Sequence, residues 1–160
     1  MRDSELFDKA VGKFFEPIAR NLSLPISKLG DGIYEISSQY FILRIRLHTG
    51  HQRGLNVLLR PKSFHDFDEN NPGSEMGIKC FVEFYGGDIQ NTCIEVSSDE
   101  DFNKQAQLFA NATEQYATPY LLGKRNDWDP IQTMVKRKTE KNVEELRKLR
   151  FPKNVREEWL

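Results

Sequence analysis

The clearest pattern of hydrophobic and polar positions lies in the segment Gly32–Pro61. Between Tyr40 and His48 apolar side chains occupy every second position, and the positions between them are mostly basic. Because successive side chains of a β-strand point to opposite faces, this alternation predicts a strand with one apolar and one basic face. The segment Gly54–Arg60 repeats the alternation, and Gly32–Ile36 is expected to join as a third strand.

Pairing the two longer strands antiparallel around the loop between them matches apolar residues at every inward position. The expected pairs are Leu43 with Leu59, Ile45 with Val57, and Leu47 with Leu55. A slip of one residue would turn these side chains to the other face, so the pattern predicts the register as well as the strands. A tight turn near Ser38 and Gln39 brings in the first strand, with Tyr34 and Ile36 beside Leu43 and Phe41.

Two further strands are expected after a long loop, Lys62–Met76, which is rich in Asp, Asn, Gly and Pro. Loops of this length are uncommon in compact domains and are often functional. The apolar run Gly77–Tyr85 and the segment Asp88–Val96 follow it. We expect both to be strands joined by a two-residue hairpin turn at the intervening glycine pair, because such turns favour φ > 0.

Helical spacing of apolar residues flanks the predicted sheet. Residues 3–22 are expected to form an amphipathic helix capped by Asp3 or Ser4 and ended or kinked at Pro17. The segment 24–32 is expected to leave this helix and turn into the sheet.

Two more helices are expected after the sheet. One begins after Ser97-Ser98, where serine caps the helix and acids fill the first turn, and ends at Thr118-Pro119. The other begins at Asp129-Pro130 and stops at Pro152. The segregation of strands from helices predicts one α+β domain over residues 1–160. Its single antiparallel sheet has about five strands, with the N-terminal and C-terminal helices packed mainly on one face.

Composition narrows the classes of function. The 160 residues carry a net charge of −1, so overall charge favours neither nucleic acid nor membrane as a partner. The chain shows no signal peptide and no apolar run of about 18 residues, and we expect a cytoplasmic protein without a membrane partner. The predicted hairpin places Cys80 opposite Cys93, and in a reducing compartment we expect two neighbouring free thiols.

Candidates for metal binding or catalysis are few. The only histidines are His48, His51 and His65, and their spacing fits no familiar metal motif. The segment Asp66–Asn70 resembles the start of a calcium loop, but Asn71 and Gly77 stand where the loop needs Gly and Glu. Motifs of common nucleophilic, phosphate-binding and dinucleotide-binding enzymes are absent from the sequence. We therefore expect no metal, no cofactor and no enzymatic activity.

Acidic segments and one tryptophan are the candidate partner-binding residues. They are Asp66, Phe67, Asp68, Glu69, Asp99, Glu100, Asp101 and Trp128. Charge complementarity around an aromatic anchor is typical of protein–protein interfaces. The sequence thus favours a non-catalytic protein-binding module. Its size and lack of motifs suit a bacterial immunity protein or antitoxin that neutralises a toxin by direct binding.

Two alternatives stay open. A small enzyme or ligand-binding protein would hold a pocket of His and Asp side chains between sheet and helices, using the three histidines and carboxylates of the long loop. A nucleic-acid-binding protein would use the basic strand face, which comprises Arg44, Arg46, His48, Arg53 and Arg60. That face lacks the interleaved aromatic residues on which bases stack, which disfavours this alternative. Solvation, or pairing with carboxylates of a covering helix, would equally account for the arginines.

Overall fold

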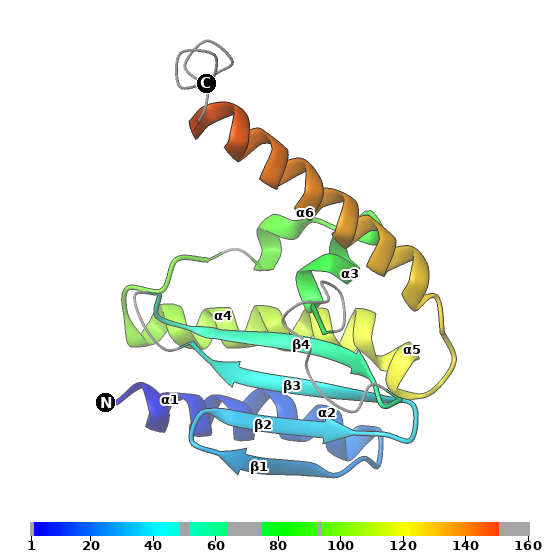
Figure 1. Cartoon of the computed structure of the whole chain (residues 1–160). Helices are drawn as coiled ribbons and strands as arrows, with labels where there is room; N and C mark the ends of the chain where they lie inside the picture. Colours follow the sequence, from blue (N-terminus) through cyan, green and yellow to red (C-terminus); the bar gives the residue numbers. More distant parts are fainter. Residues whose placement is uncertain (1, 49–51, 64–74, 93, 151–160) are drawn as a thin grey trace.

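The computed structural model describes residues 2–48, 52–63, 75–92 and 94–150 (Figure 1). The architecture is the predicted α+β arrangement, with one antiparallel sheet of five strands in sequential order. The strands are β1 (Ile26–Gly30), β2 (Ile33–Ser37), β3 (Phe41–Leu47), β4 (Leu55–Pro61) and β5 (Met76–Gly77).

The predicted pairing of β3 with β4 is confirmed. Leu43 lies opposite Leu59, Ile45 opposite Val57, and Leu47 opposite Leu55. Apart from Leu47, these side chains are fully buried. Strand β2 pairs with β3 as expected, but Tyr34 lies opposite Ile45 and Ile36 opposite Leu43, one inward pair away from the predicted match.

Two of the predicted strands are wrong. The run Gly77–Tyr85 contains a helix, α3 (Ile78–Phe84), and Asp88–Val96 contains a short 3₁₀ helix, η2 (Ile89–Thr92). The buried residues of α3 are Ile78, Phe81 and Val82, whose spacing of three and one is that of a helix face. Two other segments bring the sheet to five strands. They are β1, in a segment predicted to leave the first helix and turn into the sheet, and β5, which has only two residues.

The glycine pair after α3 ends this helix instead of turning a hairpin. Gly86 has a φ of +75°, and its N–H donates to the carbonyl of Glu83 at 3.0 Å. The N–H of Gly87 donates to the carbonyl of Val82 at 2.8 Å. Together these bonds form the Schellman motif of a helix C-terminus. Since Cys80 lies on α3, the predicted pairing of Cys80 with Cys93 across two strands is wrong, and Cys93 itself lies outside the described residues.

The helices continue past Pro17, where the sequence predicted an end or a kink, and past Pro119, where it predicted an end. Helix α1 (Asp3–Ala10) passes through a π-helical turn, η1 (Val11–Phe15), into α2 (Glu16–Asn21). Likewise α4 (Asp99–Ala112) passes through the π-helical turn η3 (Thr113–Ala117) into α5 (Thr118–Leu121). In both cases the proline is in the first turn of the next helix, where its missing N–H removes no needed hydrogen bond.

The predicted N-cap is wrong for α1 and confirmed for α4. Arg2, and neither Asp3 nor Ser4, occupies the N-cap position of α1, without a side-chain bond. At α4 the predicted serine cap is confirmed, because the Ser98 hydroxyl accepts from the N–H of Asp101 at 3.1 Å.

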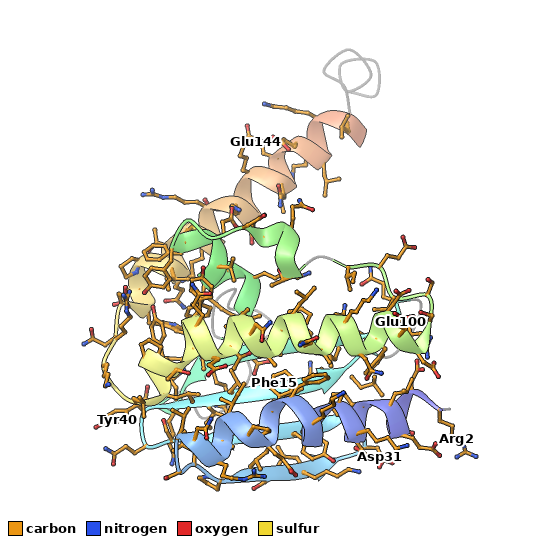
Figure 2. The ribbon with its side chains drawn as sticks, turned by 180° about the vertical axis from the view of Figure 1, so that it is seen from behind. Arg2, Phe15, Asp31, Tyr40, Glu100 and Glu144 are labelled. Carbon is orange, nitrogen blue, oxygen red and sulfur yellow. The ribbon has the colours of Figure 1, made fainter. Side chains whose placement is uncertain are left out.

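Helices α1, α2 and α4 lie on one face of the sheet and build the core with its apolar face. Figure 2 shows α1, α2 and α4 across this face. Helix α6 (Trp128–Arg150) starts beside α3 and then runs away from the rest of the molecule (Figure 1). The largest side chains between helices and sheet are fully buried and come from both layers; they include Phe7, Phe15, Phe102, Phe109, Ile36 and Leu59.

Candidate functional site

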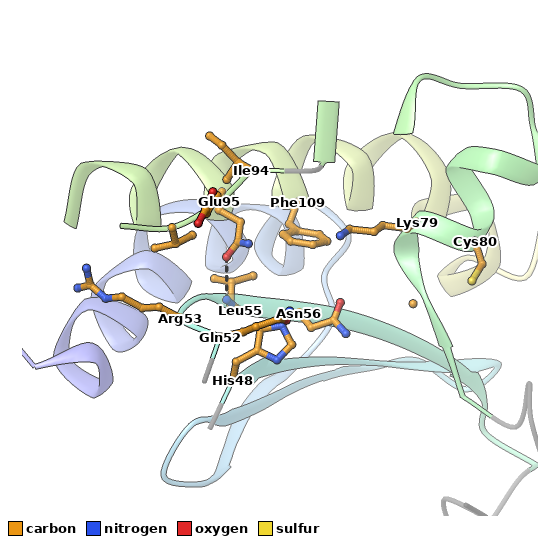
Figure 3. Close-up of a pocket in the computed structure, with 13 residues that line it drawn as sticks. His48, Gln52, Arg53, Leu55, Asn56, Lys79, Cys80, Ile94, Glu95 and Phe109 are labelled. Atoms are coloured by element: carbon orange, nitrogen blue, oxygen red, sulfur yellow. Dashed lines mark hydrogen bonds between the residues drawn. The ribbon is translucent and has the colours of Figure 1, made fainter. Parts of the chain in front are cut away.

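A cleft of about 810 Å³ opens where the ends of β3 and β4 approach α3 and α4 (Figure 3). The apolar residues that line it include Leu55, Ile94, Val96 and Phe109. The polar residues that line it include His48, Arg53, Asn56, Lys79, Glu95 and Gln105. The volume lies within the roughly 300–1,000 Å³ of small-molecule sites.

The start of β4 is fixed to α4 by one side chain. The carbonyl oxygen of the buried Gln105 amide accepts from the N–H of Leu55 at 2.8 Å. Gly54 precedes this contact with a φ of +134°, and a Cβ atom there would overlap the Gln105 amide. Glycine is therefore required for the close approach of strand and helix at this wall of the cleft.

Lys79 and His48 face the cleft from different elements. The ammonium nitrogen of Lys79 lies 5.6 Å from the ring centroid of Phe109. Burial lowers the pKa of the His48 imidazole, and the positive charges of Lys79 and Arg46 lower it further. This shift favours the uncharged imidazole, which offers one N–H donor and one nitrogen acceptor.

One alternative from the sequence was a pocket lined by histidine and aspartate side chains, and the cleft agrees with it in part. His48 lines it, but its described carboxylate is Glu95. His51 and His65 lie outside the described residues. Lys79, Asn56 and Gln105 were not predicted as site residues. No local signal marks them, because α3 was read as a strand and the cleft joins segments far apart in the chain.

The acidic residues at the start of α4 make intramolecular contacts. Arg53 bridges two carboxylates, with its guanidinium 2.8 Å from Asp3 and 2.7 Å from Asp99. The hydrogen bond from Arg53 holds the pKa of Asp99 below its usual value. The carboxylate of Asp101 accepts from the hydroxyl and the N–H of Ser97. Glu100 is the most exposed of the three acids and pairs only loosely, at 3.6 Å, with Lys104.

Trp128 belongs to the core. It is 5% exposed, and its ring packs on Phe41 and Phe81 with centroid distances of 5.7 and 5.9 Å. The structure therefore places Trp128 away from the surface and from the acids of α4. The other candidates for partner binding, Asp66, Phe67, Asp68 and Glu69, lie outside the described residues.

Carboxylates engage much of the basic strand face. The guanidinium of Arg44 lies 2.8 Å from Glu35 and 3.5 Å from Glu75. Arg60 lies 4.0 Å from the same Glu75, whose side chain is only 2% exposed. The carboxylates come from β2 and from the residue before β5, and not from a covering helix. These pairs reduce the positive charge that the face presents to a polyanion.

The distal half of α6 carries apolar side chains in water. Every described side chain from Lys136 to Leu149 is exposed. Among them Val143 is 43%, Leu146 54% and Leu149 78% exposed. Near the start of the helix, Ile131 is buried and Lys138 forms an ion pair with Glu83 of α3. The contacts of α6 with the remainder of the described chain thus concentrate in its first half.

A hydrogen-bonded cluster holds the start of α6. The hydroxyls of Tyr85 and Tyr120 donate to the two carboxylate oxygens of Asp127 at 2.6 and 2.8 Å, and lie 2.5 Å from each other. Arg125 lies over the Tyr85 ring, 4.6 Å from its centroid. Burial raises the pKa of Asp127, but the hydrogen bonds from both tyrosines outweigh this, so the net shift is downward.

Comparisons with protein-family models, curated proteins and solved structures find no match for this chain. Within the described ranges, no group of three or more His, Cys, Asp or Glu side chains is placed to hold a metal ion. Nor does any helix in the described part of the chain combine the length and apolar character needed to cross a membrane.

Proposed function

We propose that the protein is a non-catalytic protein-binding module that inserts the distal half of α6 into an apolar groove of a partner protein. The observation that carries the proposal is the exposure of Val143, Leu146 and Leu149 on a helix that leaves the rest of the molecule. Amphipathic helices bind grooves through apolar side chains spaced three or four residues apart, and these three follow one another at intervals of three residues.

The apolar face of α6 runs along the helix beyond the part that packs against α3. Ile131 is buried and Val135 is half-buried, and they share a helix face with Leu146 and Leu149. An apolar stripe usually faces a packed surface. In the first half of α6 that surface is the protein's own core, and in the second half we infer that a partner supplies it.

A groove suits the distal half of α6 better than a second copy of the same helix does. Stable interfaces bury roughly 1,200–2,000 Å² in total. Two short helices touching along three apolar side chains bury much less than this, whereas a groove encloses a helix from both sides. We therefore expect the partner to be a different protein, with an apolar groove that the distal half of α6 occupies.

The proposal is tested by placing a photo-crosslinking amino acid at Leu146 in the cells that make the protein. Position Lys141, exposed on the opposite side of α6, serves as the control. We expect one discrete crosslinked protein from position 146 and none from 141. The purified pair should then show a Kd raised at least about tenfold by Leu146→Glu, because about 1.4 kcal/mol is tenfold in affinity.

In the same assay Lys141→Glu should leave the Kd within about twofold. Leu146 is exposed, so its replacement leaves the core intact, and an unchanged thermal melt verifies this. A crosslinked partner that binds Leu146→Glu as tightly as the parent protein would contradict the proposal. Sedimentation that shows a dimer lost on Leu146→Glu would also overturn it, in favour of self-association.

Neutralisation of a toxin is the narrower form of this proposal. It is supported by the small size, the absence of catalytic motifs and the acidic residues at the start of α4. Co-production with the protein crosslinked at position 146 tests it, since an antitoxin restores growth that its toxin arrests. Among the acids, Glu100→Lys is the cleanest variant to slow association, because Asp99 and Asp101 also hold Arg53 and Ser97.

A further inference from the structure

We propose that the cleft between β4, α3 and α4 binds a small organic oxyanion, a phosphate or carboxylate attached to an apolar body. This site is separate from the distal half of α6, and its occupation does not depend on the proposed protein partner. The inference rests on the orientation of the polar groups, on the charge of Lys79 and on the apolar residues of the lining.

Two of the three side-chain amides that line the cleft, those of Gln105 and Asn56, direct their acceptors to the backbone, and the third belongs to Gln52. The carbonyl oxygen of Gln105 accepts from the N–H of Leu55 at 2.8 Å, and that of Asn56 accepts from the N–H of Val57 at 2.9 Å. Their NH₂ groups are left as the polar ends for other partners. Oxyanions accept hydrogen bonds and donate few, so a lining of this kind matches them.

Lys79 supplies the charge. Its ammonium lies against the Phe109 ring, and no carboxylate of the described residues pairs with it. Glu95 is the single described carboxylate that lines the cleft, and it is exposed. Arg53 lies at the other end, where Asp3 and Asp99 already balance it. An anion bound beside Lys79 would therefore meet one unpaired positive charge and the N–H donors of Asn56 and His48.

The apolar residues of the lining indicate that the ligand is more than an inorganic ion. Ile94 and Val96 are half-buried and offer apolar surface to the cleft, whereas Leu55 and Phe109 are almost completely buried behind it. The volume of about 810 Å³ far exceeds that of a phosphate. Apolar surface removed from water contributes roughly 25 cal/mol per Å². A ligand with a hydrophobic body is thus expected to bind more tightly than the bare anion.

The test uses inorganic phosphate, phenyl phosphate and benzoate as probes, each titrated at low salt into the ¹⁵N-labelled full chain. We expect saturable amide shifts in α3, β4 and α4, with phenyl phosphate binding at least about fivefold more tightly than phosphate. Phenyl phosphate above benzoate identifies phosphate as the preferred anion, and the reverse order identifies carboxylate. Absence of saturable shifts with all three probes overturns the proposal.

Two variants and one matched control locate the anion. Lys79→Met should raise the Kd of the better probe about tenfold, since hydrogen bonds to charged groups contribute about 1.5–3 kcal/mol. Lys13→Met is the control, because Lys13 also lies over a phenylalanine ring, Phe14 at 5.2 Å, but away from the cleft. If both variants weakened binding equally, the anion would be held only by the overall charge of the protein, and the proposed site would be rejected.

Asn56→Asp provides a variant that keeps the structure but reverses the chemistry. An aspartate accepts the Val57 N–H as asparagine does, yet replaces the NH₂ donor by a negative charge. We expect it to abolish anion binding, and retained binding would overturn the proposal even if Lys79→Met failed to fold.

The His48 imidazole reports on the bound anion directly. It faces Lys79 and Arg46, and Arg53 and Glu95 line the same cleft. A bound anion offsets these positive charges, so the pKa of His48 should rise on saturation, as measured by ¹H NMR with His48→Gln for assignment. A His48 pKa that stays constant while the probe saturates would place the anion elsewhere.

Discussion

At the scale of single residues, most of the polar chemistry in the described chain stabilises contacts between elements. Arg53 joins α1 to α4 through two carboxylates, and Arg44 joins β2 to the residue before β5. These residues were predicted as members of a binding surface, because charge is visible in a sequence and its partner is not. Lys79 is the opposite case, a site residue that was not predicted. Its position over Phe109 depends on helix α3, and the sequence of α3 predicted a strand.

The aspartate that holds the start of α6 predicts a pH dependence of stability. The folded-state pKa of Asp127 lies below the value of about 3.9 in an unfolded chain. Its stabilising contribution is therefore complete above that pH and is lost as the pH falls through the folded pKa. Asp127→Asn should lower the free energy of unfolding at pH 7 by about 1–3 kcal/mol and make its decline in acid shallower.

Urea unfolding from pH 7 down to pH 3 measures this difference. Asp99 and Asp101 shift in the same direction, so the parent and the variant both lose stability in acid, and the prediction concerns the gap between them. Tyr85→Phe removes one donor to Asp127 and should move the loss to higher pH. Asp31→Asn, at an exposed turn, is the control. Parallel curves for the parent and Asp127→Asn would contradict the assignment.

At the scale of elements, alternation was the reliable signal and uniform apolar runs were not. In β3 and β4 each inward residue alternates with a polar or half-buried one, so period and register could both be predicted. The run Gly77–Tyr85 is mostly apolar, with Lys79 and Glu83 as its only charged residues, and it is compatible with either structure until its neighbours are known. Glycine pairs are equally ambiguous, because a hairpin turn and a Schellman motif both need φ > 0.

Helix ends supply the prediction at this scale. Helices α3 and α5 end at glycines, Gly86 and Gly123, with φ of +75° and +70°. Helix α2 ends with the same pair of hydrogen bonds around Ser23, whose φ is +55°. A left-handed conformation costs a non-glycine residue roughly 1–2 kcal/mol. The substitution Ser23→Gly removes this backbone strain but adds the conformational entropy cost of glycine. We expect a net increase in the free energy of unfolding of about 0.5–1 kcal/mol.

Chemical denaturation of Ser23→Gly tests this expectation, with Gly86→Ala as the reciprocal variant. A Cβ atom at Gly86 meets no atom within 4 Å, so its substitution isolates the backbone effect and should destabilise the protein by about 1 kcal/mol. Destabilisation by Ser23→Gly would show that the serine side chain contributes more than the strained backbone costs.

At the scale of the whole molecule, the layers could be predicted and the cleft could not. The sheet has one apolar face, and amphipathic helices precede and follow it along the chain. This combination predicts a two-layer α+β fold. The cleft draws on β3, β4, α3, α4 and the segment before α4, and its lining depends on how these elements meet at one end of the sheet. The hydrophobic pattern of the sequence does not show how these elements pack together unless helix α3 (Ile78–Phe84) is already known.

The same view of the whole molecule predicts unequal stability along α6. Its first half packs through Ile131 and the Lys138–Glu83 pair, whereas the side chains from Thr139 to Leu149 contact water. Helical segments of about 12 residues are marginal without tertiary packing. Amide hydrogens of residues 142–149 should therefore exchange orders of magnitude faster than those of Phe102–Phe109 in α4, whose exchange requires opening of the core.

Hydrogen–deuterium exchange at single-residue resolution measures this contrast, and Ile131–Val135 provides an internal reference within α6. The crosslinked partner identified through Leu146 should slow exchange in residues 142–149 and leave α4 unchanged, because groove binding orders the helix that it encloses. Phenyl phosphate should instead slow exchange around Lys79 and leave α6 as it was. Slow exchange of residues 142–149 in the isolated monomer would mean that their helix is stable without a partner, and would contradict this prediction.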